Sequence, residues 1–140
     1  MTALDRRMML AAGLGGAAAM SLVVSRASAE HYPATAGQPL EGSEGGVRRV
    51  KLSERPTMIS GFNKVSLIDI VFPPGSKDRL EEMPAAMVCH CTEGQLTITN
   101  DGETFTVKAN DVWTCRKGGA EEAVNNGSSQ AVMRVAILTA

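Results

Sequence analysis

The chain has 140 residues, with 14 basic and 15 acidic side chains and a formal net charge of −1. This length suits one domain and excludes two. The basic residues are scattered and only 4% of the residues are aromatic. A basic stripe and a stacking platform are therefore both missing, and nucleic acid is not expected as a partner.

The first 29 residues have the three parts of an export signal. Arg6 and Arg7 precede an uncharged, glycine-containing run, and the triplet Ala27-Ser28-Ala29 supplies the small residues of a cleavage site. The paired arginines before a weakly hydrophobic run resemble a bacterial twin-arginine signal. We expect cleavage after this triplet and a periplasmic or secreted protein with no membrane association. The alternative is a retained membrane anchor.

The segment 30–46 is rich in glycine, proline, serine, alanine and glutamate and has few large apolar residues. Such a segment buries too little surface to order itself. We therefore expect a flexible leader over 30–46 and one folded domain over 47–140.

From residue 47 onward the apolar residues recur with a period of two, which indicates strands. Asn100-Asp101-Gly102 supplies residues that tolerate positive φ and predicts a tight hairpin. Only Lys77–Met83 has the pattern of a helical turn, and Pro84 would end it. The expected strands are 65–72, 86–91, 95–99, 104–107, 112–115, 121–124 and 131–138. Seven or eight short strands separated by turns indicate a sandwich or barrel.

Two stretches between Gly75 and Asn125 match the spacing of the two motifs of the cupin superfamily. The first family motif is a glycine, five residues, His-x-His, three or four residues, a glutamate, six residues and a glycine. Here that spacing leads from Gly75 to Glu81, Met83, Met87 and Gly94. The chain thus resembles a small single-domain cupin of type 2.

The second family motif is a glycine, five residues, Pro-x-Gly, two residues, a histidine, three residues and an asparagine. The corresponding positions here are Asn110, Arg116, Gly118, Glu121 and Asn125. The resemblance implies an all-β fold, a double-stranded β-helix or jelly-roll barrel.

The four positions at which the family holds its metal carry no histidine here. They are Glu81, Met83, Met87 and Glu121. A typical cupin site of three imidazoles and a carboxylate suits iron, manganese, nickel or zinc, whereas two carboxylates and two thioethers do not. The metal-dependent activities of the family are therefore not expected, and no cofactor is expected.

The two histidines of the chain do not restore such a site. His31 lies in the leader. With a period of two, Met87, Cys89 and Cys91 share one face of a strand and His90 points to the other. Export implies an oxidising compartment, and a disulfide between Cys115 and Cys89 or Cys91 stays open.

The sequence favours an exported cupin-domain protein that binds a small molecule in the mouth of its barrel. The residues expected to line that mouth are Glu81, Met83, Met87, Cys89 and Glu121. The sequence leaves open whether the chain forms a homodimer and whether it is catalytic.

Two alternatives remain beside the binding function. The first is a metal-independent isomerase or lyase that uses Glu81 and Glu121 as paired carboxylates, with Arg116 as an ionic partner. The second is a Cu(I)-binding protein, because thiolates and thioethers select this soft ion. Its ligands would be Met83, Met87, Cys89 and Cys91, joined by Cys115 if that strand also points inward.

Overall fold

Ten antiparallel strands arranged in two facing sheets make up the part of the chain that the computed structural model describes, residues 31–140. The expected export signal lies outside the described residues. In chain order the strands are β1 (Gln38–Pro39), β2 (Arg48–Pro56), β3 (Lys64–Phe72), β4 (Lys77–Leu80), β5 (Ala86–Glu93), β6 (Gln95–Asn100), β7 (Glu103–Lys108), β8 (Val112–Cys115), β9 (Glu121–Val124) and β10 (Ala131–Thr139).

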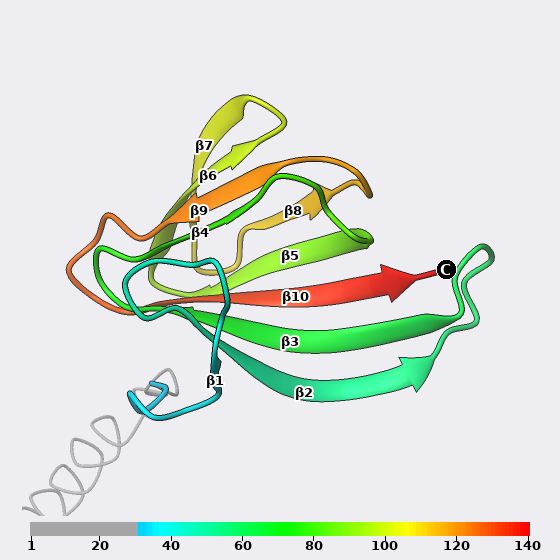
Figure 1. Cartoon of the computed structure of the whole chain (residues 1–140), viewed down its shortest axis with the longest axis horizontal. Coiled ribbons are helices and arrows are strands. Elements are labelled where there is room, and N and C mark those ends of the chain that lie inside the picture. Colours follow the sequence, from blue (N-terminus) through cyan, green and yellow to red (C-terminus); the bar gives the residue numbers. More distant parts are fainter. Residues whose placement is uncertain (1–30) are drawn as a thin grey trace, which may run out of the picture. The chain divides into compact units, whose positions relative to one another are not determined.

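One sheet has six strands in the order β1-β2-β3-β10-β5-β8, and the other has four in the order β4-β9-β6-β7 (Figure 1). Tyr32–Ala140 form the unit that contains both sheets. Among residues 31–140, no helix is long and apolar enough to cross a membrane. The all-β jelly-roll fold predicted from the sequence is confirmed.

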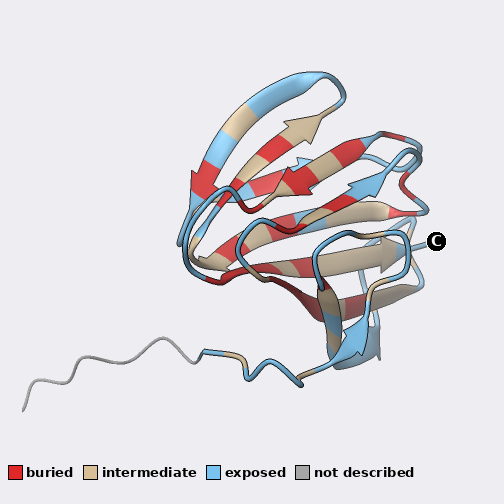
Figure 2. Ribbon diagram, turned by 60° about the vertical axis from the view of Figure 1, so that its left-hand side comes forward, coloured by how far each residue is buried: buried red, intermediate tan, exposed pale blue. Residues whose placement is uncertain are grey.

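Alternation of apolar and polar residues places the core between the sheets. Along β3, Ile68, Ile70 and Phe72 point into the core, and along β6 Leu96 and Ile98 do the same. Figure 2 shows buried residues recurring along the strands of both sheets. Each such side chain contributes about 1.5–3 kcal/mol when it leaves water, so the two inner faces hold the barrel together.

The strands expected from the period-two pattern are all present, with ends that differ by no more than two residues. The hairpin is also confirmed, since Asn100 pairs with Glu103 and the two turn residues Asp101 and Gly102 have φ of 48° and 86°. Positive φ at both central residues is the signature of a type I′ turn, whose twist matches that of the flanking strands.

The helical turn expected over 77–83 is wrong. Lys77–Leu80 instead forms β4, which pairs with β9 in the four-stranded sheet. Asp78 points inward and is buried, while its neighbour Arg79 is exposed. Pairing with β9 overrides the local pattern, since the preference of a short segment depends on the strand it contacts.

The segment expected to be a flexible leader is attached to the six-stranded sheet from residue 32 onward. Gln38–Pro39 pairs with β2. The Arg48 guanidinium donates hydrogen bonds to the carbonyl oxygens of Pro33 (2.8 Å) and Ala36 (2.7 Å). Backbone pairing and side-chain bonds therefore order a segment whose composition offers little apolar surface.

A second attachment joins this segment to the outer face of the sheet. Asp69 on β3 is fully buried and receives two hydrogen bonds from Arg134 on β10, Nε to Oδ1 at 2.8 Å and Nη2 to Oδ2 at 2.9 Å. The Tyr32 hydroxyl donates a further short hydrogen bond to Asp69 Oδ2. Arg134 and Tyr32 together satisfy a carboxylate whose burial would otherwise be costly.

This contact predicts an unusual titration of Tyr32, the only tyrosine of the chain. Burial, then the hydrogen bond to Asp69 and the charge of Asp69, raise the pKa of Tyr32 from 10.0 to about 12. In the unfolded chain the phenol ionises at its ordinary pKa, so the contact contributes stability below that pH. This contribution is lost as the pH rises through the folded pKa.

We expect the tyrosinate absorbance to show a midpoint near the raised value in the folded protein. Asp69→Asn should move the midpoint down towards the ordinary pKa, and Tyr32→Phe should cost about 1 kcal/mol in urea unfolding, the usual worth of one hydrogen bond. A wild-type midpoint at the ordinary pKa would contradict the contact.

Candidate functional site

Three buried side chains with reactive or metal-binding atoms meet inside the barrel. They are Cys89 of β5, Cys115 of β8 and Glu121 of β9, and one donor atom from each lies within 4.8 Å of the others. Their exposed fractions are 1%, 3% and 6%. Because β5 and β8 belong to one sheet and β9 to the other, this thiol–carboxylate cluster bridges the two layers.

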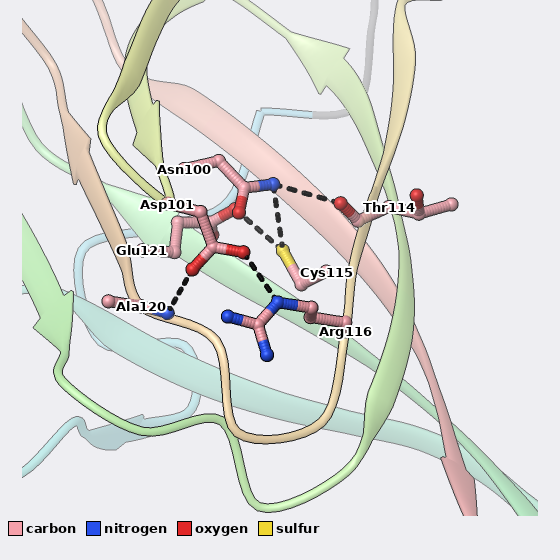
Figure 3. A network of polar contacts seen from close by, with 7 residues as sticks. All are labelled: Asn100, Asp101, Thr114, Cys115, Arg116, Ala120 and Glu121. Carbon is pink, nitrogen blue, oxygen red and sulfur yellow. Dashed lines mark hydrogen bonds and ion pairs between the residues drawn. The ribbon is translucent and has the colours of Figure 1, made fainter.

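The Glu121 carboxylate is held by two donors. Its Oε2 accepts a hydrogen bond from Trp113 Nε1 at 2.9 Å and another from the Cys115 thiol at 2.8 Å. Asn100 on β6 donates to the Thr114 carbonyl at 2.9 Å and lies 3.7 Å from Cys115 Sγ (Figure 3). The two hydrogen bonds to Glu121 Oε2 offset part of the cost of burying this carboxylate.

The cluster follows from the alternation and register of two neighbouring strands. Along β8, Trp113 and Cys115 are buried while the residues between and before them are exposed. In the β5–β8 ladder, Cys115 lies opposite Met87 and Trp113 lies opposite Cys89. Cys89 and Cys115 are diagonal neighbours on one face, and their sulfur atoms are 3.9 Å apart.

The surroundings of Cys115 and Cys91 favour the protonated form of these two thiols. The hydrogen bond with Cys89, burial and the negative charge of Glu121 raise the pKa of Cys115 far above its ordinary value. Burial likewise raises the pKa of Cys91. A reactive cysteine needs a lowered pKa, so neither thiol has the character of an activated nucleophile.

The structure does not bring Glu81 to the cluster. Its side chain is 80% exposed and forms an ion pair with Arg79 at 3.2 Å. The expected pairing of Glu81 with Glu121 is therefore wrong, because the loop after β4 turns Glu81 into solvent. Arg116 is not the partner of Glu121 either, since it binds Asp101 at 2.9 Å.

A second inward acid in this part of the barrel is Asp78 of β4, whose ladder partner Ala123 is two residues from Glu121. Burial raises the pKa of Asp78, and the charge of Glu121 raises it further. The local pattern of 77–83 predicts a helical turn and therefore does not indicate this inward position. Recognising a strand there would have placed Asp78 on the inner face by alternation.

The expected methionines lie on the inner side of the barrel. Met83 is buried with an exposed fraction of 3%, and the half-buried Met87 packs against the core. Cys89 and Cys91 face the interior as predicted, with exposed fractions of 1% and 0%. His90 lies on the other face, where its ladder partner is Arg134.

The sulfur set expected for a soft metal needs one correction. The Cys91 thiol is directed to the carbonyl oxygens of Glu93 (3.4 Å) and Gly94 (3.7 Å). The partner of Cys89 is Cys115 instead. All three cysteines are free thiols in this structure, so the disulfide left open by the sequence is not formed here.

Comparison with known proteins assigns the barrel to a fold class. No family model matches the chain, and no curated protein sequence matches it. The structure is similar to a predicted oxalate decarboxylase from Thermotoga maritima, with a TM-score of 0.61 and 18% identity over 74% of this chain and 89% of that one. It is also similar to an RmlC-like cupin from Shewanella frigidimarina, with a TM-score of 0.58 and 16% identity over 79% and 89%.

A third similar structure is a putative ethanolamine utilization protein from Salmonella typhimurium, with a TM-score of 0.58 and 17% identity over 74% of this chain and 79% of that one. Likeness at these identities shows the fold. The chain is a cupin-fold protein.

The residues present do not fit the metal that the fold class implies. Of the four corresponding positions, Glu81 faces solvent, Met83 and Met87 offer thioethers, and Glu121 alone offers a buried carboxylate. Iron, manganese and nickel sites of this kind are built from imidazole and carboxylate. A single carboxylate already bonded by an indole and a thiol is not such a set.

Elemental analysis of the purified protein should therefore find iron, manganese, nickel and zinc well below one ion per chain. The physical reason is the lack of imidazole ligands, which supply most of the affinity of such sites. One equivalent of any of these metals, lost in Glu121→Ala, would contradict this reasoning.

Proposed function

We propose that this chain is an exported cupin-fold protein that binds a small molecule at the Glu121 end of its barrel, without the histidine-bound metal of the fold class. The observation that carries the proposal is the Glu121 carboxylate. It is buried at an inner position of β9, held by Trp113 and Cys115, and flanked by a second inward acid, Asp78. Barrel ends that combine apolar walls with a few fixed polar groups are common ligand sites.

The residues define the chemistry of the ligand. A carboxylate offers about four lone-pair positions, and Trp113 and Cys115 occupy two of those of Glu121, both on Oε2. The lone pairs that remain favour a ligand with hydroxyl or amine donors. Met83 and Met87 add polarisable apolar contacts. A small hydroxylated or amino compound with a short apolar part suits this combination.

The enzyme alternative has less support than binding. It required Glu81 and Glu121 as an acid and a base, and Glu81 is exposed and ion-paired with Arg79. General acid–base chemistry needs both groups within reach of one substrate. We therefore propose a binding role in place of isomerase or lyase chemistry.

Export is part of the proposal and rests on the sequence of residues 1–29. The mature protein should begin at Glu30, because the small-residue triplet ends the signal-like segment there. Intact-mass measurement of the protein recovered from the exported fraction checks this. A membrane-associated form with an intact N-terminus would contradict it.

Ligand binding can be tested with a panel of ethanolamine, short diols and monosaccharides, first by thermal shift and then by calorimetry. We expect at least one compound to raise the melting temperature of the wild type by mass action. Glu121→Gln should weaken binding of that compound by about 10- to 100-fold, the worth of a hydrogen bond to a charged group.

Glu122→Gln is the matched control, since the next residue of β9 points to the other face and is only half-buried. It should bind as the wild type does. Equal affinity of the wild type and Glu121→Gln, or no binding by any compound of the panel, would count against this site.

A further inference from the structure

Two free thiols inside the barrel face each other, and the function proposed above uses one of them, Cys115, only as a hydrogen-bond donor to Glu121. Cys89 Sγ and Cys115 Sγ are 3.9 Å apart, and both side chains are almost fully buried. We propose that Cys89 and Cys115 form a Cu(I)-binding site, with Met87 as a third sulfur ligand.

The sulfur–sulfur distance suits a shared ion. Metal–thiolate bonds are about 2.3 Å long, so two thiolates on a three-coordinate ion lie about 4.0 Å apart. The observed 3.9 Å needs almost no movement of either strand. A disulfide requires a bond of about 2.05 Å, so the two sulfurs would have to approach each other much more closely.

The third ligand comes from the ladder register. Met87 lies directly opposite Cys115 in the β5–β8 pair, on the same inner face, and it packs against the core. Residues directly opposite in an antiparallel pair have Cβ atoms about 4.5–5.5 Å apart, within reach of a long thioether side chain. Two thiolates and one thioether are all soft donors, and such donors select Cu(I).

The binding step balances without a redox partner. Cys89 and Cys115 bind Cu(I) as thiolates, and their two protons pass to solvent. Copper keeps its oxidation state throughout.

The inference goes beyond the proposed small-molecule function and does not require it. The two sites adjoin at the hydrogen bond between Cys115 and Glu121, but the ligands of copper are sulfur atoms. Substitution of the cysteines leaves the carboxylate in place, so a failed copper experiment and a failed small-molecule experiment are distinguishable.

The test uses the mature chain, reduced beforehand and shown to hold three titratable thiols, with Cu(I) supplied anaerobically from a chromophoric competing chelator. We expect one Cu(I) per chain and a rise in melting temperature. Cys89→Ser and Cys115→Ser should each abolish both effects. Met87→Leu, which conserves volume, should weaken binding by about 10-fold or more.

Cys91→Ser is the matched control. Cys91 is as buried as Cys89 and shares its face of β5, but its thiol is directed to backbone carbonyls outside the cluster. This variant should bind Cu(I) as the wild type does. Circular dichroism melts of the copper-free variants separate loss of the site from loss of the fold.

Several outcomes would overturn the proposal. If the reduced wild type binds no Cu(I), the thiols are packing residues only. Cu(I) binding that survives both Cys89→Ser and Cys115→Ser would also contradict the site. So would a loss of Cu(I) binding in Cys91→Ser as large as in the other two cysteine variants. If the protein instead retains one equivalent of Zn(II) against a chelator and loses it in Glu121→Gln, the site is a zinc site built from thiolate and carboxylate.

Discussion

The antiparallel register between β5 and β8 is the constraint on which the site depends. It places Cys115 opposite Met87 and Trp113 opposite Cys89, so that three sulfur-bearing side chains and an indole lie on one inner face. A slip of β8 by one residue would move Trp113 and Cys115 to the outer face. The contacts of β5 with β10 on its other side fix the position of the strand, so the register of one ladder is set within the whole six-stranded sheet.

Burial of Glu121 ties this sheet to the opposite one. A carboxylate removed from water is costly unless donors replace its hydration. Trp113 and Cys115 provide those donors from the facing sheet. The pKa of the Cys115 thiol is raised by its hydrogen bond with Cys89 and by burial, and the contact with Glu121 adds to that shift. The contact that satisfies Glu121 thus also favours the protonated thiol.

The barrel is that of the cupin fold, but the side chains inside it belong to a different chemistry. Solved structures with the same fold support the architecture and leave function to the residues of each site. Where the resemblance leads one to expect imidazoles, this chain has sulfur and carboxylate. A further buried carboxylate, Asp69, has a structural role. With Arg134 and Tyr32 it holds the N-terminal segment on the outer face of the sheet.

The sequence by itself determined the strands, the type I′ hairpin and the inward face of β5, because period-two alternation and turn residues act over a few neighbouring positions. It also determined that the four metal positions of the fold class lack histidine. Only the tertiary structure decided which acid lies beside Glu121 and which thiol lies beside Cys89. Glu81 and Asp78 are three residues apart, yet pairing of β4 with β9 buries one and a loop exposes the other. Cys115 meets Cys89 across 26 residues of sequence, and the segment 32–46 is held by partners in β2 and β3. Such contacts depend on strand pairing between distant segments, which no local pattern of residues contains.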